Sequence, residues 1–565
     1  MTIKMAYQRS APKEPATILF ASIPFEYLAD TAAAWAERGI RGFMLAHIMS
    51  NWDSDVWLSD GKRIVGEDNP LLQRTKRMNE VCREHTLNRN FIKVAFYSHL
   101  PDWFDDVGWS RLLENFRQAA VFAREGLFRG VAIDIEYINE IYELSWKDYQ
   151  KPGYPVSELR GKSEERGAEI IRSMVDEYPG MEVLHLPQGP ECYGPLATDL
   201  FRGMCVEMAE RNAPGGLHLL TEETYTRTNP DWLLRYAQDL DALAEGILPE
   251  GPRSYWRKKC SISFGLWPLG YYRQILDGSG KFLGYGGKRE KFGDKVIGSY
   301  GDKSENYSVD EFRRQLAISR MVCKRYVWIY CHGSTLWQLG KDQMARYHGS
   351  ASDELPVVNN LDQYIDVIRR AEVLSDRAIS AMARKIRDGV RVDFLASLGS
   401  PKAWNVIGPF DNPEGTGFSI QYPPERGIDL DASHQGASGE VKWETVRVSS
   451  TGFVNLRSAV HPHNYMCAYA LAYARVPDSR DAVVLLGSDD GAKLWIDGKQ
   501  VFALDVVRGA EPDQDRIPVR LRRGIVPVLL KVTNHRGAWG FYLRIVDEDG
   551  KAFKGLRWSL GKARP

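Results

Sequence analysis

The stretch Gly130-Val131-Ala132-Ile133-Asp134-Ile135-Glu136-Tyr137 places two carboxylates at the end of a run rich in β-branched residues. Successive side chains of a strand alternate between its two faces, so Asp134 and Glu136 share one face and the β-branched residues share the other. We expect the β-branched face to pack under helices and the acids to face the inside of a barrel near its mouth. A buried ion there is costly unless it is paired or used, so the stretch predicts a chemical site.

Short apolar runs alternate with amphipathic helical patterns from about residue 16 to about residue 390. This alternation predicts eight βα units, which close into a (β/α)8 TIM barrel with its active site at the carboxyl ends of the strands. The sixth helix is the clearest, because Asn229 is a typical N-cap and Pro230 suits the first helical position. The expected strands are 18–22, 42–48, 92–98, 130–136, 182–186, 217–222, 260–267 and 326–332.

The pattern changes near residue 397, and only strand-like alternation follows. We therefore expect an α/β fold in which a (β/α)8 catalytic barrel, residues 1–396, precedes an all-β sandwich, residues 397–565. The dipeptide Asp497-Gly498 between two apolar runs predicts a two-residue hairpin in the second domain. Three long connections, 50–69, 138–155 and 269–309, follow strands on the expected active face and are expected to line its cleft.

Composition limits the partners of the chain. Lys and Arg number 74 against 74 Asp and Glu, so no long-range field favours nucleic acid or an anionic membrane. We find no apolar stretch of bilayer length and no hydrophobic signal core near the start. The expectation is a soluble protein, cytoplasmic, or periplasmic or secreted if a leader was removed. The seven Cys lack paired spacing and predict buried free thiols, and the oligomeric state is not predicted.

Hydrolysis of a glycosidic bond needs two carboxyl groups, one protonated and one ionised. Glu136, nearer the mouth, is the expected acid, because burial and the charge of Asp134 should raise its pKa. The run 216–223 supplies a second source of acids. Glu222 is preferred there because it alternates onto one face with the polar His218, and Glu223 is the alternative. The competing interpretation is that these acids only form ion pairs with basic residues.

Other polar and aromatic residues fall at the same strand ends and are expected to bind substrate, with Trp267 and Trp337 as stacking platforms. A catalytic metal is not predicted, because the candidate His come from different strands and no His-Glu-x-x-His motif occurs. The expected substrate-binding residues are Tyr97, Tyr137, His185, Tyr225, Trp267, His332 and Trp337.

The run 130–136 resembles that of chitinase-type glycoside hydrolases, whose pattern is Asp-Gly-x-Asp-x-Asp-x-Glu with the Glu as proton donor. Asp134 and Glu136 match the last two acids, whereas the first two acids are absent. The resemblance implies that Glu136 is the proton donor and Asp134 its partner. The missing acids put substrate-assisted cleavage of an N-acetyl sugar in doubt.

Residues 487–499 are similar to the protective-antigen-type sugar-binding sandwich that is attached to many bacterial glycosidases, and residues 404–410 resemble the entry strand of accessory modules in polysaccharide-degrading enzymes. The resemblance implies that Asp489 and Asp490 could hold a structural calcium, and no other cofactor is expected. The alternative for these two residues is a tight turn.

Together these patterns predict a glycoside hydrolase that cleaves an oligo- or polysaccharide by paired-carboxylate catalysis, with carbohydrate as its partner. Two other functions remain open at this stage. One is a non-catalytic carbohydrate-binding protein on a barrel scaffold, and the other is a polysaccharide lyase or metal-dependent hydrolase.

Overall fold

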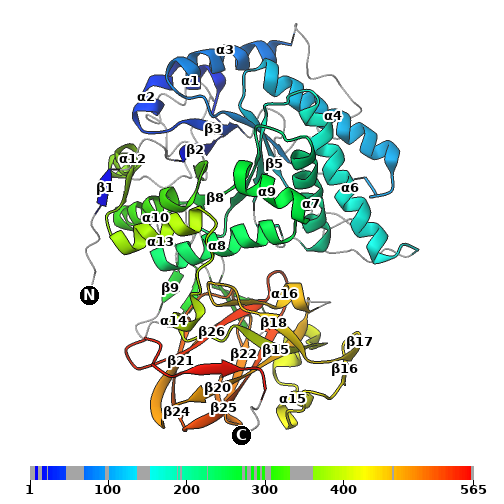
Figure 1. The fold of residues 1–565 in the computed structure, drawn as a ribbon, viewed down its shortest axis with the longest axis vertical. Coiled ribbons are helices and arrows are strands. Elements are labelled where there is room, and N and C mark those ends of the chain that lie inside the picture. The colour runs from blue at the N-terminus through cyan, green and yellow to red at the C-terminus, as the bar shows by residue number, and fades with distance from the viewer. Residues whose placement is uncertain are drawn as a thin grey trace. The chain divides into compact units, whose positions relative to one another are not determined.

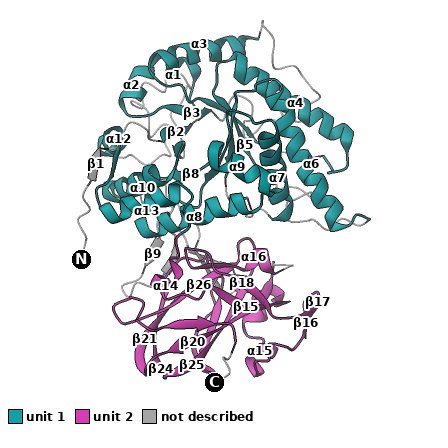
Figure 2. Cartoon of the chain, viewed as in Figure 1, with its two compact units in different colours: residues 1–270, 306–391 teal, residues 271–305, 392–565 magenta. Residues whose placement is uncertain are grey.

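A computed structural model describes residues 7–9, 15–21, 23–45, 69–95, 101–135, 153–187, 189–190, 194–225, 227–269, 274–276, 282–285, 289–292, 295–298, 307–330, 360–460 and 464–561. The chain forms two compact units, which Figure 2 distinguishes by colour. Unit 1 comprises residues 1–270 and 306–391, and unit 2 comprises 271–305 and 392–565. The later boundary lies between 391 and 392, whereas the sequence predicted it between 396 and 397. Segment 271–305, which the sequence assigned to the barrel domain, groups with unit 2.

Unit 1 contains a closed barrel of eight parallel strands in the order β13-β2-β3-β4-β5-β6-β7-β8 (Figure 1). Each strand overlaps one of the eight expected from the sequence, and antiparallel sheets follow in the C-terminal region, so the predicted TIM barrel and β-sandwich are confirmed. The barrel strands are β2 (Ala16–Ala21), β3 (Gly42–Leu45), β4 (Phe91–Ala95), β5 (Gly130–Asp134), β6 (Glu182–Leu186), β7 (Leu217–Thr221), β8 (Ser261–Leu266) and β13 (Tyr326–Ile329).

Helices of unit 1 flank these strands. The predicted sixth helix is α8, and the Asn229 side chain caps it by accepting hydrogen bonds from the N–H groups of Asp231 and Trp232 at 2.9 and 3.2 Å. The helices are α1 (Phe25–Asp30), α2 (Ala32–Glu37), α3 (Pro70–Glu84), α4 (Asp106–Glu125), α6 (Val156–Val175), α7 (Pro195–Glu210), α8 (Pro230–Gly246), α9 (Glu250–Lys259), α10 (Val309–Val322), α12 (Leu361–Arg370) and α13 (Arg377–Arg387).

In the described part of residues 1–391, three small antiparallel pairs lie outside the barrel sheet. The strands β1 (Tyr7–Arg9) and β14 (Glu372–Leu374) pair with each other. Two hairpins interrupt the segment between β8 and α10. They are β9 (Gln274–Leu276) with β10 (Phe282–Tyr285), and β11 (Arg289–Phe292) with β12 (Lys295–Gly298).

The amino ends of the barrel strands meet at a buried charge cluster around Glu182. Its carboxylate accepts hydrogen bonds from Arg325 and Tyr326, and His218 Nε2 lies 3.6 Å away. Burial is the largest single influence and would raise the pKa of Glu182, but the hydrogen bonds from Arg325 and Tyr326 and the charges of His218 and Arg325 together lower the pKa to about 2. His218 is thus on the inner face, as predicted, but its Nδ1 bonds Ser261 at 2.9 Å at this end, which in TIM barrels is associated with stability.

Unit 2 is a sandwich of a seven-stranded sheet, order β18-β15-β20-β25-β22-β23 with β27 beside β20, and a four-stranded sheet, order β19-β26-β21-β24. The Asp497-Gly498 hairpin is confirmed, because Ile496 of β22 pairs with Lys499 of β23. The strands are β15 (Ala403–Asp411), β18 (Glu444–Arg447), β19 (Phe453–Asn455), β20 (Met466–Val476), β21 (Arg480–Asp489), β22 (Ala492–Ile496), β23 (Lys499–Leu504), β24 (Asp515–Leu521), β25 (Gly524–Asn534), β26 (Gly540–Val546) and β27 (Arg557–Ser559).

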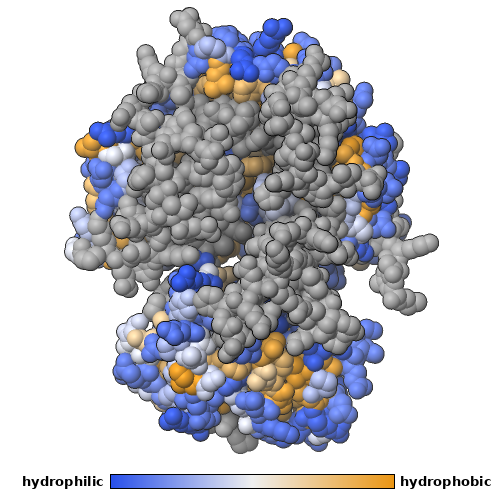
Figure 3. Space-filling model, turned by 180° about the vertical axis from the view of Figure 1, so that it is seen from behind, coloured by the Kyte–Doolittle hydropathy of each residue, from blue (hydrophilic) through white to orange (hydrophobic). Residues whose placement is uncertain are grey.

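The core of unit 2 lies between its two sheets, where alternate residues such as Val406, Leu494 and Phe541 are fully buried. A second, smaller apolar cluster covers the other face of the seven-stranded sheet, and Figure 3 shows hydrophobic residues at the surface of this unit. The remaining short elements are α14 (Leu395–Leu398), the 3-10 helix η2 (Pro413–Phe418), α15 (Pro423–Arg426), β16 (His434–Gly436), β17 (Gly439–Val441) and α16 (Leu456–Ala459).

Asp489 and Asp490 lie where the chain passes from β21 in one sheet to β22 in the other. The two carboxylate oxygens of Asp490 accept the backbone N–H groups of Arg508 and His535 at 2.9 and 2.8 Å. Asp490 therefore braces two loops. In the part of the chain that the structure describes, no group of three or more His, Cys, Asp or Glu side chains is arranged to hold a metal ion.

Five cysteines, Cys82, Cys205, Cys260, Cys323 and Cys467, are buried free thiols, in agreement with the prediction from their spacing. Cys192 and Cys331 lie outside the described residues. Of the helices described above, none combines the length and the hydropathy that crossing a membrane requires.

Candidate active site

The candidate site lies at the carboxyl ends of the barrel strands, and the structure describes only part of it. Asp134, His185, Glu222, Glu223, Tyr225 and Trp267 are described. The other predicted site residues, Tyr97, Glu136, Tyr137, His332 and Trp337, lie outside the described residues, as does most of the three long connections.

Asp134 forms a buried ion pair with Lys93 of β4. The Lys93 Nζ lies 2.6 Å from Asp134 Oδ2, and the two side chains are 2% and 5% exposed. Parallel pairing of β4 with β5 sets Lys93 opposite Ala132, so both charges share the inner face. Asp134 is thus paired with an inward Lys, as the competing interpretation of the sequence proposed. Because Lys93 balances its charge, repulsion from Asp134 is not a sufficient reason for a raised pKa at Glu136.

Glu222 follows β7, and local hydrogen bonds fix its position. Its backbone N–H donates to Pro187 O at 2.7 Å, and its Oε1 accepts a hydrogen bond from the Tyr225 hydroxyl at 3.0 Å. Glu222 is half-buried. A hydrogen bond donated to a carboxylate stabilises its ionised form, so this arrangement suits a nucleophile or a base better than an acid.

The turn that carries Glu222 is anchored on three sides. The Thr224 hydroxyl donates to Gly265 O of β8 at 2.7 Å, and Gln315 of α10 donates through Nε2 to Thr224 O at 2.6 Å. Thr221 Oγ1 and the Tyr236 hydroxyl of α8 are 3.0 Å apart. A carboxylate held by such supporting bonds is pre-organised, which catalysis requires.

Glu223 differs from its neighbour in its surroundings. Its side chain is 43% exposed, and Arg227 Nη2 lies 3.5 Å from its Oε1. The surrounding protein raises the pKa of Glu223, although the charge and hydrogen bond of Arg227 act in the opposite direction. The two adjacent carboxyl groups therefore differ in their surroundings, since Glu222 is half-buried and accepts a hydrogen bond from Tyr225, whereas Glu223 is exposed beside Arg227.

Aromatic rings fill the space beside Glu222. The Tyr225 ring lies 5.4 Å from that of Trp267 and 5.7 Å from that of Tyr330, and Trp267 lies 4.8 Å from Tyr330. Tyr225 and Trp267 are each only 5% exposed. The expected stacking platform at Trp267 is therefore largely covered, and these rings mainly support Glu222. A Cβ at Gly265 would lie 2.7 Å from Tyr225, so only glycine leaves room for this ring without a shift.

Contacts inside the barrel connect Asp134 of β5 with Glu222, which follows β7. Lys93 Nζ lies 5.2 Å from the centre of the Phe20 ring of β2, and Phe20 lies 5.2 Å from Tyr330. Tyr330 in turn contacts Tyr225, which holds Glu222. Asp134 and Glu222 are thus joined through Lys93 and three aromatic rings, as two groups facing one interior would be. Lys93 and Phe20 were missed from the sequence.

His185 does not belong to this site. It pairs across the sheet with Ile133 and Leu219, and its ring packs edge-on against Phe201 of α7 at 5.0 Å, in the layer between barrel and helices. Neither ring nitrogen has a hydrogen-bond partner among the described residues. Burial lowers the pKa of His185 to about 4, against the opposing charge of Asp134, so the imidazole is neutral at pH 7. The prediction that His185 binds substrate assumed the wrong face of the strand.

No protein-family model matches the chain, and no curated protein matches it. Among solved structures, the chain is similar to a glucosidase from Croceicoccus marinus, with 9% identity over 93% of this chain and 96% of that chain and a TM-score of 0.33. It is similar to TsXylA, an intracellular xylanase from Thermoanaerobacterium saccharolyticum, with 8% identity over 63% and 96% and a TM-score of 0.32.

A third similar structure is the PA14 domain of the MpAFP antifreeze protein, with 13% identity over 18% of this chain and a TM-score of 0.15. This chain spans 54% of the length of that domain. Likenesses at these identities and TM-scores do not identify a function, which has to be inferred from the residues of this chain.

Proposed function

We propose that the protein is a glycoside hydrolase that cleaves an O-glycosyl bond of an oligo- or polysaccharide. Glu222 acts as the ionised carboxylate, either nucleophile or base, and Glu136 acts as the proton donor. Asp134, held by Lys93, positions the end of β5, from which Glu136 follows. Glu223 is the alternative second carboxyl group. The sandwich of unit 2 is proposed as an accessory carbohydrate-binding domain.

One observation carries the proposal: Glu222, which follows β7, is linked through Tyr225, Tyr330 and Phe20 to the Lys93–Asp134 pair on β4 and β5. Active sites of TIM barrels lie at the carboxyl ends of the strands. Hydrolysis of a glycosidic bond requires two carboxyl groups that flank the bond. Glu222 is ordered by Tyr225 and by the anchored turn, which supports a residue that acts repeatedly in one geometry.

The ion pair supports a specific division of labour between the acids. Asp134 is almost fully buried and bonded to Lys93, so it is poorly placed to attack a sugar. Glu222 is half-buried and its carboxylate accepts a hydrogen bond, so it can reach a substrate while ionised. These two states favour Glu222 as the reacting group and Asp134 as a positioning group.

The test compares Glu136→Gln, Glu222→Gln and Glu223→Gln with wild type on a panel of aryl glycosides and neutral polysaccharides. We expect kcat/KM to fall by about 100-fold or more in the first two variants, since general acid–base catalysis contributes roughly 100- to 10,000-fold. Glu245→Gln is the matched control, because Glu245 of α8 pairs with Arg257 of α9, outside the candidate site. Wild-type rates in both of the first two variants would refute the proposal, as would sugar binding by wild type without any product.

A further inference from the structure

A group of exposed apolar side chains lies at the beginnings of α4 and α6, outside the site described above. Val107, Tyr154 and Val156 are 66%, 38% and 40% exposed, and they are three of the six exposed large apolar side chains in the described part of the chain. With Phe104 they form what we call the rim platform. Helices of a (β/α)8 barrel run opposite to its strands, so the beginnings of α4 and α6 lie toward the active face.

Two aromatic rings form the centre of the rim platform. Phe104 precedes α4 and Tyr154 precedes α6, and their rings stack with centroids 4.1 Å apart and planes inclined by 14°. The Tyr154 ring is 38% exposed, and a flat exposed ring suits the apolar C–H face of a sugar, whereas its hydroxyl can also contact sugar hydroxyl groups.

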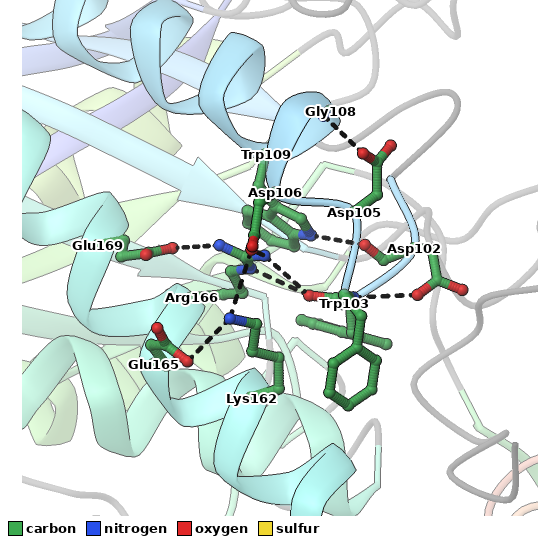
Figure 4. Close-up of polar contacts among 11 residues, drawn as sticks. Asp102, Trp103, Asp105, Asp106, Gly108, Trp109, Lys162, Glu165, Arg166 and Glu169 are labelled. Carbon is green, nitrogen blue, oxygen red and sulfur yellow. Dashed lines mark hydrogen bonds and ion pairs between the residues drawn. The ribbon is translucent and has the colours of Figure 1, made fainter. Parts of the chain in front are cut away.

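The segment before α4 is held rigidly, as Figure 4 shows for its polar contacts. Trp103 O accepts hydrogen bonds from Arg166 Nε and Nη2 at 3.1 and 3.0 Å, and the Trp109 indole N–H donates to Asp102 O at 3.1 Å. Arg166, on α6, is buried, and its guanidinium lies 5.0 Å from the Trp109 ring. Phe104 therefore rests on a fixed loop, and little ordering is needed when a ligand binds.

A groove of about 440 Å³ lies between α4 and α6, and Asp106 in its lining directly precedes Val107 of the rim platform. Its charged lining is Asp106, Glu114, Glu165, Glu169, Arg117, Lys162 and Arg166. Four carboxylates against three cations give a net charge of −1, and most of these groups are already ion-paired with one another, as Lys162 is with Glu165 at 3.0 Å. Such a surface offers donors and acceptors to neutral hydroxyl groups, but it gives an anionic polymer no excess of positive charge.

We propose that the rim platform and this groove form a second binding site, which takes an uncharged oligosaccharide segment apart from the catalytic carboxylates. One sugar ring stacks on the side of the Tyr154 ring that Phe104 does not cover, and further hydroxyl groups bond to the ion-paired side chains of the groove. The site would hold part of a long chain near the barrel mouth. The class of ligand rests on the proposed function, because stacking rings alone do not distinguish a saccharide from another flat apolar surface.

The test measures binding of cellohexaose, xylohexaose, mannohexaose and the anionic hexagalacturonate to the full chain by calorimetry. All variants carry Glu222→Gln so that no probe is hydrolysed. We expect at least one neutral hexasaccharide to bind, and Tyr154→Ala to weaken it about three- to tenfold, the range of one aromatic stacking contact. Tyr154→Trp should keep the affinity because it keeps a flat ring. Val390→Ala, which shortens an exposed side chain of unit 1 elsewhere, is the control.

Unchanged binding in Tyr154→Ala would overturn the inference, as would tighter binding of hexagalacturonate than of every neutral probe, or no neutral binding at all. A change of oligomeric state in Tyr154→Ala would also overturn it, because the rim platform would then be an interface between copies. Tyr154→Ala with Glu222 intact should hydrolyse a short aryl glycoside within twofold of wild type. That assay, repeated with Glu222→Gln, tests the proposed function separately.

Discussion

Removal of one hydroxyl should move the pH dependence of the enzyme. Tyr225 donates a hydrogen bond to Glu222 Oε1 at 3.0 Å, and Tyr225→Phe deletes that bond while it keeps the ring against Trp267 and Tyr330. The bond favours the ionised form of Glu222, so its loss raises the pKa of that carboxyl. If ionised Glu222 reacts, the acidic limb of the kcat/KM profile moves to higher pH.

The expected size follows from the strength of the bond. A hydrogen bond to a charged group contributes about 1.5–3 kcal/mol, and 1.36 kcal/mol corresponds to about one pKa unit. Glu222 is half-buried, so solvent can partly replace the lost donor and the lower end applies. We expect the acidic limb to shift upward by about one pH unit, with little change on the alkaline side.

Tyr236→Phe is the matched control, because its hydroxyl contacts Thr221 of the same turn at 3.0 Å. The assay is the initial rate on an aryl glycoside between about pH 4 and pH 9, with the fold of each variant checked by circular dichroism. An acidic limb that stays in place in Tyr225→Phe, or that moves equally in Tyr236→Phe, would refute the assignment of Glu222 as the ionised group.

Three further predictions concern stability. Lys93→Met leaves Asp134 buried without its cation and should lower the free energy of unfolding by about 3–5 kcal/mol in urea titrations, whereas Lys93→Met/Asp134→Leu should recover most of it. Gly265→Ala places a Cβ 2.7 Å from Thr221 O and from Tyr225 and should cost about 1–3 kcal/mol, whereas Gly161→Ala, in α6 with nothing within 4 Å, should be neutral or stabilising. Acid should destabilise the barrel in two steps. The pKa of His218 is lowered from 6.5 to about 4, chiefly by burial, so the unfolded chain takes up this proton first and stability falls from pH 6.5 to 4; Glu182, lowered from 4.5 to about 2, extends the loss below pH 4.5. Equal stability at pH 7 and pH 4 would contradict this assignment.

The barrel could be predicted from the sequence because its strands carry a local signal. Five- to eight-residue apolar runs and a capped helix such as the one that begins at Asn229-Pro230 need no tertiary information to be recognised. The grouping of segment 271–305 with unit 2 has no such signal, because it depends on contacts between residues far apart in the chain.

The site could be predicted from the sequence only where alternation within one strand determines the face on which a residue lies. Alternation correctly assigned Asp134 and His218 to the inner face of their strands. It does not give the position of a side chain along the barrel axis, and His218 lies at the amino end beside Glu182. His185 was misassigned because nothing in its own run marks the inner face. The signal that could have found Lys93 was a lone charge in the apolar run 91–95.

Lys93 also changes how the end of β5 should be understood. A carboxylate inside a barrel could raise the pKa of a neighbouring acid by repulsion, but Asp134 has a cation 2.6 Å away, and the pair carries little net charge. Any elevation of the pKa of Glu136 must then come mainly from desolvation or from the substrate. It follows that Asp134→Asn, which keeps the shape and leaves Lys93 unbalanced, should shift the alkaline limb of the pH profile to lower pH, since an unpaired cation favours an ionised Glu136. The repulsion model also predicts a downward shift for Asp134→Asn, so the distinguishing variant is Lys93→Met/Asp134→Leu. This variant removes both charges. If the ion pair has no net effect on the pKa of Glu136, the alkaline limb should stay in place. If Asp134 raises that pKa by repulsion, the limb should move to lower pH.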